Sequence, residues 1–162
     1  MMSFLSNQAI SQETKTAYTT YYLIRHAEKD TLNPQEKNPD LTQEGIQRAD
    51  NWAALFSEIT FDEIYSTDYK RTVNTAKPIA LDQNIEIKYY HPKEVYQTGF
   101  LAATQGKTVL IVGHSNTIPV FANYLIGKEK YSEFPETIYN NLYTITKDQN
   151  GQVINDTLSQ IE

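Results

Sequence analysis

The 162-residue chain contains no cysteine, and this absence removes several kinds of chemistry at once. Disulfide bonds, zinc sites built on thiolates and phosphatases with a cysteine nucleophile are all excluded. The absence does not assign a compartment, because an exported domain of this size can be stable without disulfides.

Long apolar runs and an excess of basic charge are also missing. No apolar run approaches the roughly 20 residues that a membrane-spanning helix needs. The chain has 14 Lys and Arg against 20 Asp and Glu, a net charge of −6, and its pI is about 5.1. This balance disfavours nucleic acid as a partner, and the length suits one domain with a single core.

We expect residues 1–17 to be a flexible segment before a single domain at 18–162. Met1 to Leu5 is briefly apolar, and Ala9-Ile10-Ser11 resembles a small-x-small cleavage site. A basic start and a full apolar stretch are lacking. Two interpretations therefore stay open. A truncated secretory signal would place the protein in the periplasm or outside the cell, and an ordinary frayed terminus would leave it cytoplasmic.

Two apolar strands that end in histidines are the most informative part of the sequence. Tyr21–Ile24 reads as a buried strand and is followed at once by Arg25 and His26. Thr108–Val112 is a second apolar strand, and His114 follows it. Open α/β sheets place their ligand sites at the carboxyl ends of strands. If the two strands are neighbours, both imidazoles face one pocket.

The apolar periodicity elsewhere predicts alternating helices and strands. Helices are expected after Thr42 and over residues 69–81, 94–105 and 117–126, and further strands over residues 61–66, 85–89, 142–146 and 153–158. Asn150-Gly151 is a strong hairpin signal. The pattern predicts an α/β fold: a three-layer α/β/α sandwich with a mainly parallel sheet and an antiparallel C-terminal edge hairpin.

Local signals predict how two of these helices begin and pack. Thr42 is expected to cap the first helix, with Ile46 and Trp52 on its core face. Asp68 is expected to cap the helix over residues 69–81. Pro78 inside that helix should kink or shorten it.

Four motifs, in this order, resemble those of the histidine phosphatase superfamily, also called phosphoglycerate mutase-like. They are Arg25-His26-Ala27-Glu28-Lys29, Asp40-Leu41-Thr42 with Gly45, Ser66 to Arg71 with Thr75-Ala76, and Gly113-His114-Ser115-Asn116. The first motif is similar to that of the compact members. The resemblance implies a phosphoglycerate mutase-like fold and phosphoryl transfer through a phosphohistidine, with no metal and no cofactor.

Two arginines and two histidines converging on one pocket would make an anion site. Arg25 and Arg71 are expected to hold phosphoryl oxygens through paired hydrogen bonds and to stabilise charge during transfer. A neutral imidazole is a competent nucleophile, and nearby positive charge favours the neutral form. We expect His26 to be the nucleophile, as the resemblance also implies, and His114 to hydrogen-bond the transferring group.

Four polar residues are weaker candidates for substrate binding. Ser66 and Thr72 would supply neutral donors, and Asn116 follows His114 closely enough to touch substrate. Glu28 is a further candidate, although a solvated Glu-Lys pair is an equally ordinary interpretation.

The leaving oxygen needs a proton, and its donor is the least specific prediction. In the family this acid usually lies between the second arginine and the second histidine, where Asp82, Glu86 and Glu94 stand. We favour Glu94, with His91 as an alternative. Glu94 is also ordinary on the surface of a helix, and His91 as a structural histidine. Some compact family members lack a dedicated acid.

Together these features predict a metal-independent phosphatase that acts on a phosphomonoester or on a phosphorylated protein side chain. Its partner would be a phosphorylated small molecule or a phosphoprotein. A catalytically weak phospho-ligand-binding domain on the same fold is one alternative. A phosphoglycerate mutase-type phosphotransferase is another, disfavoured because the segment between Thr72 and Gly113 is too short for a lid that excludes water. A metal hydrolase is disfavoured by the arginine directly before His26.

Overall fold

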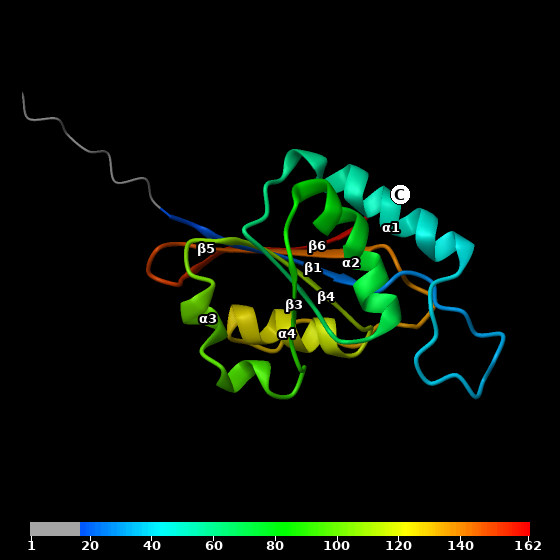
Figure 1. Ribbon diagram of the computed structural model, residues 1–162. Helices are drawn as coiled ribbons and strands as arrows, with labels where there is room; N and C mark the ends of the chain where they lie inside the picture. Colours follow the sequence, from blue (N-terminus) through cyan, green and yellow to red (C-terminus); the bar gives the residue numbers. More distant parts are fainter. Residues whose placement is uncertain (1–16) are drawn as a thin grey trace, which may run out of the picture.

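The computed structural model describes residues 17–162 (Figure 1), so the predictions for the N-terminal segment lie outside the described residues apart from Ala17. The strands are β1 (Thr19–Arg25), β2 (Glu63–Ser66), β3 (Ile87–Tyr89), β4 (Thr108–Gly113), β5 (Asn141–Lys147) and β6 (Val153–Gln160). The helices are α1 (Gln43–Leu55), α2 (Lys70–Gln83), α3 (Phe100–Ala103) and α4 (Thr117–Ile126), with short 3-10 turns η1 (Phe56–Glu58) and η2 (Val95–Gln97).

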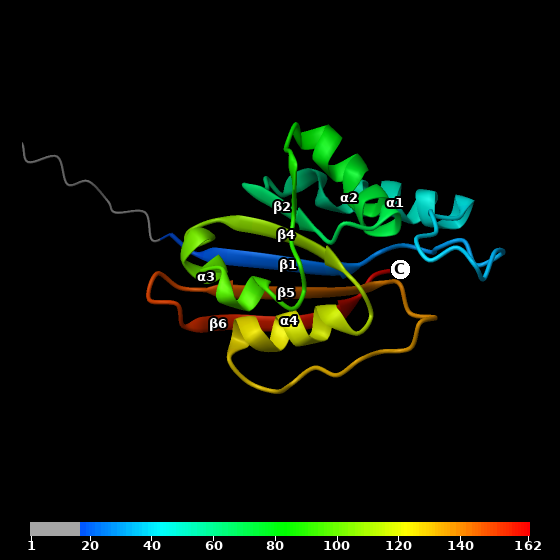
Figure 2. The same ribbon diagram turned by 60° about the horizontal axis from the view of Figure 1, so that its bottom comes forward.

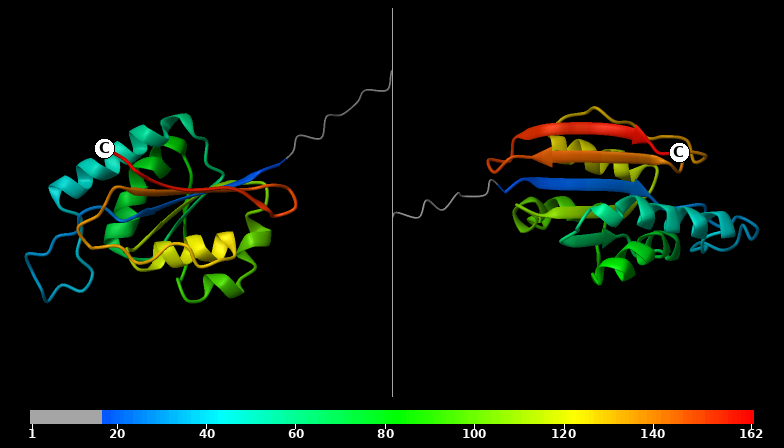
Figure 3. Two further views of the ribbon diagram at one scale, coloured as in Figure 1. Left: turned by 180° about the vertical axis from the view of Figure 1, so that it is seen from behind. Right: turned by 90° about the horizontal axis from the view of Figure 1, so that it is seen from above.

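The six strands form one sheet in the order β3-β2-β4-β1-β5-β6. β3, β2, β4 and β1 run parallel, whereas β5 and β6 are antiparallel to their neighbours and close one edge of the sheet (Figure 3). Helices α1 and α2 cover one face, and α3 and α4 cover the other (Figures 1 and 2). The predicted three-layer sandwich with a mainly parallel sheet and an antiparallel edge hairpin is confirmed.

The apolar strands are continuous because both of their faces are covered. In β4, Val109 and Ile111 pack against the α4 side, and Leu110 and Val112 pack against the α1–α2 side. Strand β1 alternates in the same way. None of the helices within residues 17–162 combines the length and the apolar character that crossing a membrane requires.

The predicted start of α1 is confirmed, but one of its core residues is not. The Gly45 amide donates to Thr42 Oγ1 at 3.0 Å, so Thr42 caps the helix. Ile46 is 46% exposed, because the buried face of α1 consists of Gly45, Ala49, Trp52 and Ala53 and Ile46 lies at the edge of that face, in the first turn of the helix.

The predicted cap of α2 is wrong, and so is the predicted shortening at Pro78. Asp68 does not cap the helix. Instead, Asn38 of a distant loop accepts the Lys70 amide at 3.0 Å. Pro78 does not shorten the helix, which runs on to Gln83. Buried residues before and after the proline hold both halves against the sheet, and this packing outweighs the local cost of the proline.

The strand pairing brings three chain segments together at one edge of the sheet. Arg25 of β1 is in register with Gly113 of β4, and Ser66 of β2 is in register with Val112. The His26 amide donates to the Gly113 carbonyl at 2.9 Å, which extends the β1–β4 pairing by one residue. The segments that follow these strands therefore leave the sheet side by side.

Candidate active site

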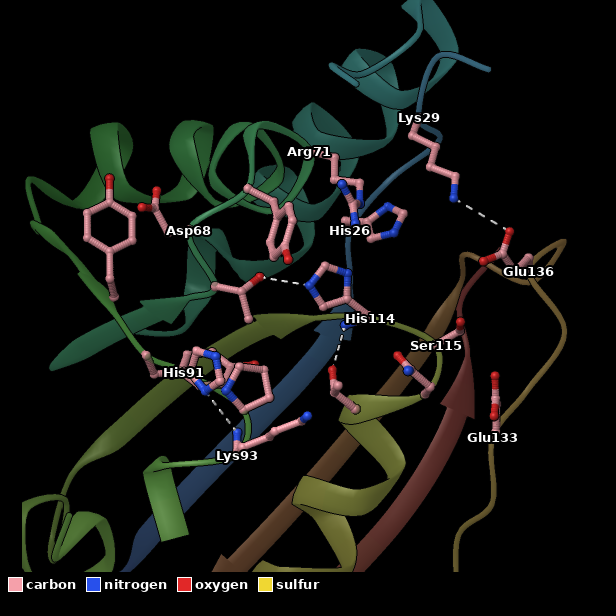
Figure 4. A pocket seen from close by; sticks show the side chains of 17 residues that line it. His26, Lys29, Asp68, Arg71, His91, Lys93, His114, Ser115, Glu133 and Glu136 are labelled. Atoms are coloured by element: carbon pink, nitrogen blue, oxygen red, sulfur yellow. Dashed lines mark hydrogen bonds and ion pairs between the residues drawn. The ribbon is translucent and has the colours of Figure 1, made fainter. Parts of the chain in front are cut away.

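A hollow of about 890 Å³ lies at these strand ends, and Figure 4 shows its lining. Both strand-end histidines, His26 and His114, face it together with Arg71 and Lys29. The two imidazole rings are 5.4 Å apart between centroids. Asn116, at the start of α4, also lines the hollow. The structure thus brings together residues from segments that lie far apart in the sequence.

The hydrogen bonding of His26 identifies its free nitrogen. Nδ1 lies 2.7 Å from the carbonyl oxygen of Ala27. Because a carbonyl oxygen can only accept, Nδ1 carries the hydrogen, and Nε2 of the neutral ring keeps its lone pair. Burial, aided by Arg25, His114 and Arg71, lowers the pKa of His26 to about 3, against the opposing effect of the Ala27 hydrogen bond. A neutral imidazole with a free Nε2 is equipped for nucleophilic attack.

His114 is also held neutral and is oriented by two hydroxyl groups. Burial, followed by the charges of Arg71, Arg25 and Lys29, lowers its pKa to about 4. Thr67 Oγ1 donates to Thr72 Oγ1 at 3.0 Å and lies 2.9 Å from His114 Nε2. Since the hydroxyl hydrogen of Thr67 is already used, Nε2 of His114 is the donor in that contact. Nδ1 is then the nitrogen that gains a proton when the ring becomes charged.

The two arginines keep nitrogens without a hydrogen-bond partner. In the described part of the chain, Nε and Nη2 of Arg25 and Nε and Nη1 of Arg71 are buried and unpaired. Arg25 is only 1% exposed and lies in the wall behind the lining, where its Nη1 donates to the carbonyls of Glu136 and Ile138 at 2.7 and 2.9 Å. Burial lowers the guanidinium pKa of both residues. Because the ordinary pKa of arginine is so high, both side chains stay charged. Buried, charged and unpaired donors fit an oxyanion.

Each of these guanidinium groups rests on the face of a tyrosine ring. Arg25 Cζ lies 4.1 Å from the centroid of Tyr139, and Arg71 Cζ lies 4.6 Å from that of Tyr69. Such stacking stabilises the cation without using its in-plane N–H groups. The tyrosines therefore fix the orientation of the arginines and leave their donors available for an anion.

Besides Arg25, four predicted site residues lie outside the lining of the hollow. Ser66 and Thr72 are fully buried, and their hydroxyls donate to backbone carbonyls. The Glu28 carboxylate accepts a hydrogen bond from Arg48 Nε at 2.8 Å, and the Arg48 guanidinium lies near the ring of Tyr139. Glu94 has a side chain that is 76% exposed and lies 3.9 Å from His91 Nδ1, whereas His91 itself lines the hollow.

The carboxyl groups that do line the hollow were not among the predicted site residues. They are Asp68, Glu133 and Glu136. Lys29 Nζ lies 3.6 Å from the Glu136 carboxylate, and this pair spans one side of the opening (Figure 4). Glu133 and Glu136 belong to the irregular segment before β5, which has no periodicity that would mark it as part of a site.

A metal centre would require several donors close together. Within residues 17–162, no group of three or more His, Cys, Asp or Glu side chains is arranged to hold a metal ion.

The structure is a three-layer α/β protein with a hollow at the carboxyl ends of its central strands, lined by His26, His114 and Arg71 and backed by Arg25. Residues 21–91 match the family model of the histidine phosphatase superfamily, branch 1. The matched segment contains Arg25, His26 and Arg71. The resemblance drawn from the four motifs is confirmed, and the chain fits the histidine phosphatase superfamily.

Solved structures of similar fold cover nearly the whole chain. A protein from Agrobacterium tumefaciens assigned as the phosphohistidine phosphatase SixA is 23% identical, with a TM-score of 0.61 over 86% of this chain and 97% of that one. Phosphoserine phosphatase from Entamoeba histolytica is 18% identical, with a TM-score of 0.68 over 89% and 98%. The protein histidine phosphatase SixA complexed with tungstate is 12% identical, with a TM-score of 0.70 over 87% and 96%. At these identities the likeness establishes the fold.

No functionally curated protein matches the chain significantly by sequence.

Proposed function

We propose that this protein is a metal-independent phosphatase that hydrolyses phosphoesters through a phosphohistidine intermediate on His26. The observation that supports this most strongly is the pairing of a neutral imidazole, whose Nε2 is free, with two arginines whose buried donors are unpaired. The first provides a nucleophile, and the second provides charge for the phosphoryl oxygens. The names of the A. tumefaciens and E. histolytica structures, a phosphohistidine phosphatase and a phosphoserine phosphatase, point the same way.

The reaction has two displacements at phosphorus. In the first, His26 Nε2 forms a P–N bond, the P–O bond to the leaving group breaks, and the leaving oxygen takes up a proton. In the second, water attacks the phosphohistidine, the P–N bond breaks, and phosphate leaves. Arg25 and Arg71 stabilise the equatorial oxygens in both steps. His114 is neutral in the free protein, takes up a proton at Nδ1 when the bound phosphoryl group raises its pKa, and then stabilises the same oxygens.

Four titratable groups of the lining are our candidates for exchanging the proton of the leaving group. They are the carboxyl groups of Asp68, Glu133 and Glu136 and the imidazole of His91. Glu94 points to solvent beside His91, and we therefore expect it to be dispensable. A hollow of about 890 Å³ that is open to solvent admits water to the intermediate, which favours hydrolysis over transfer to a second acceptor.

The test is hydrolysis of an aryl phosphate, with and without EDTA, by the wild type, His26→Ala and Glu94→Gln. Because the aryl leaving group needs little protonation, this substrate reports the nucleophile and the anion site. We expect activity that survives EDTA, falls at least a thousandfold in His26→Ala and stays within threefold in Glu94→Gln. Acid-labile phosphate bound to the wild-type protein after rapid quenching would identify the intermediate.

Two outcomes would contradict the proposal. Wild-type protein that binds inorganic phosphate without hydrolysing any ester would be a phospho-ligand-binding domain on the same fold. Activity lost to EDTA and restored by a divalent cation would indicate a metal hydrolase.

A further inference from the structure

A second hollow, of about 750 Å³, runs along the outer face of α4 and has no part in the chemistry proposed above. Its floor includes Asn116, Val120 and Tyr124, which are spaced four residues apart and therefore lie on one side of the helix. Val120 is 53% exposed although the helix is strongly apolar. Tyr96 of η2 and the segment that follows α4 form the walls. Figure 2 shows this segment running beside the helix. We call this hollow the α4 groove.

The α4 groove is continuous with the pocket that holds His26. Asn116 and Glu133 line both hollows. A group attached to a phosphoryl seated at the arginines therefore has a direct path into the groove. From Asn116 to Tyr124 the floor extends for about 12 Å, since eight helical residues rise about 1.5 Å each. That length accommodates about three residues of extended polypeptide, more than the leaving group of a small monoester requires.

The walls of the α4 groove are held in place before any ligand arrives. The side chain of Asn123 donates to the Tyr131 carbonyl at 2.7 Å and accepts from the Tyr131 and Lys130 amides at 2.8 and 3.0 Å. On the other side, the rings of Tyr96 and Tyr124 pack with centroids 4.7 Å apart. Binding in a preformed groove avoids much of the entropic cost of ordering loops.

The chemistry of the α4 groove favours a polypeptide. Tyr96, Tyr124 and Tyr131 give it apolar ring faces with hydroxyls at their edges, a combination suited to peptide side chains and backbone. Its charged residues are Lys128, Glu129 and Glu133. One cation against two anions disfavours a second phosphate or a nucleic acid. An apolar or basic peptide segment meets no such repulsion.

We propose that the α4 groove binds the residues next to a phosphorylated side chain, so that the substrate is a phosphorylated polypeptide. This inference rests on the proposed phosphatase function and assigns its substrate class. The peptide would leave the pocket at Asn116 and follow α4 towards Tyr124.

The test compares peptides with free phosphoamino acids. The probes are three pools of nine-residue peptides with phosphoserine, phosphotyrosine or phosphohistidine at the centre and randomised flanks, together with the three free phosphoamino acids. We expect kcat/KM for at least one pool to exceed that of its free phosphoamino acid at least tenfold. The ratio of the two values should fall at least fivefold in Val120→Gln, which places a longer polar chain on the floor.

Leu81→Gln is the matched control, because Leu81 is also an exposed apolar residue on a helix, 70% exposed on α2 and outside both hollows. Its ratio should stay within twofold of the wild type. Free phosphoamino acids preferred over every pool would indicate a small-molecule substrate and overturn the proposal. A ratio that Val120→Gln does not change would also overturn it.

Failure of the phosphatase proposal has a different signature, because no substrate, including the aryl phosphate, would then release phosphate. In that case the same pools are tested for binding by fluorescence anisotropy. The groove predicts binding to the wild type at least fivefold tighter than to Val120→Gln, and equal binding would contradict it.

Discussion

At the scale of single residues, the site depends on keeping two histidines neutral among cations. His26 and His114 lie close to each other and to Arg71, so a proton on either ring would be repelled from several directions. Hydrogen-bond partners then decide which nitrogen is free: the Ala27 carbonyl for His26, and Thr67 for His114. Charge and hydrogen bonding thus set both the protonation state and the tautomer.

The first prediction concerns titration of these histidines. Because burial and nearby cations lower their pKa values to about 3 and about 4, both rings should stay neutral from pH 8 to pH 5, where an ordinary histidine gains its proton near 6.5. The chain has three histidines, so each imidazole signal can be assigned by NMR with single His→Gln variants. Inorganic phosphate should raise the pKa of His114, since an anion favours the charged ring. Titration of His26 or His114 near pH 6.5 in the free protein would contradict this account.

The second prediction concerns the tyrosine beneath Arg71. Tyr69→Leu removes the aromatic face 4.6 Å from the guanidinium, worth about 1 kcal/mol, and should raise the KM for aryl phosphate and the Ki of inorganic phosphate about fivefold. Tyr69→Phe keeps the ring and should restore values within twofold of the wild type. If both variants weaken phosphate equally, the hydroxyl and not the stacking is what matters.

At the scale of elements, the site depends on side chains that join β1 to the helices. Thr75 of α2 accepts the buried amide of Ala27 at 2.9 Å and donates to the Arg71 carbonyl at 2.7 Å, so one hydroxyl links the segment of His26 to the helix of Arg71. Gly45 acts in the same region, since a Cβ there would lie 2.3 Å from the Glu28 carbonyl oxygen. Both residues occur in the motifs from which the family resemblance was drawn.

The third prediction tests this link. Thr75→Val keeps the shape of the side chain but leaves the Ala27 amide unpaired, so we expect a loss of about 1–3 kcal/mol in the free energy of unfolding. Catalysis should fall as well, because the link sets the position of His26 relative to Arg71. Thr98→Val, at an exposed threonine of similar local bonding, is the control and should cost less than about 0.5 kcal/mol. Urea denaturation measures both variants, and equal losses would show that Thr75 has no special role.

At the scale of the whole molecule, acid stability has an identifiable origin in the sheet. Glu63 of β2 is buried, which by itself raises its pKa. Hydrogen bonds from Lys107, Lys88 and Tyr65 outweigh burial and lower the pKa to about 2. The partners come from the adjoining strand β3, from the residue directly before β4 and from β2 itself. One carboxylate therefore stabilises three neighbouring strands.

The fourth prediction follows from the sign of this shift. A lowered folded-state pKa means that Glu63 stabilises the protein fully above about pH 4.5 and loses this contribution as the pH falls towards 2. His26 and His114 also lower the stability as the pH falls below 6.5. Their pKa values are lower in the folded protein, so the unfolded chain binds protons that the folded chain does not bind. Glu63→Gln should cost about 1–3 kcal/mol at pH 7 and flatten the fall in stability below pH 4.5.

Glu86→Gln, at an exposed carboxylate just before β3, is the matched control and should change stability by less than about 0.5 kcal/mol. Urea denaturation at several pH values provides the curves. An unchanged slope below pH 4.5 in Glu63→Gln would show that other groups govern acid unfolding.

The amino-acid sequence by itself determined the class of fold and the position of both histidines of the candidate site at strand ends. Apolar runs ending in Arg25-His26 and Gly113-His114 marked two strands and placed the histidines at their carboxyl ends. The Asn150-Gly151 signal marked the edge hairpin. These inferences succeeded because hydrophobic periodicity and turn chemistry are local properties, and because parallel strands share one edge for their ends.

Only the tertiary structure decided which other groups meet at that edge. Arg25 contacts Glu136, 111 residues away, and its stacking partner Tyr139 lies in the same distant segment. Ser66 and Thr72 turned out to be buried, Glu94 lies outside the hollow, and the α4 groove unites residues from two loops and a helix. Contacts of this kind depend on how separate segments pack, and no spacing within one segment of the sequence records them.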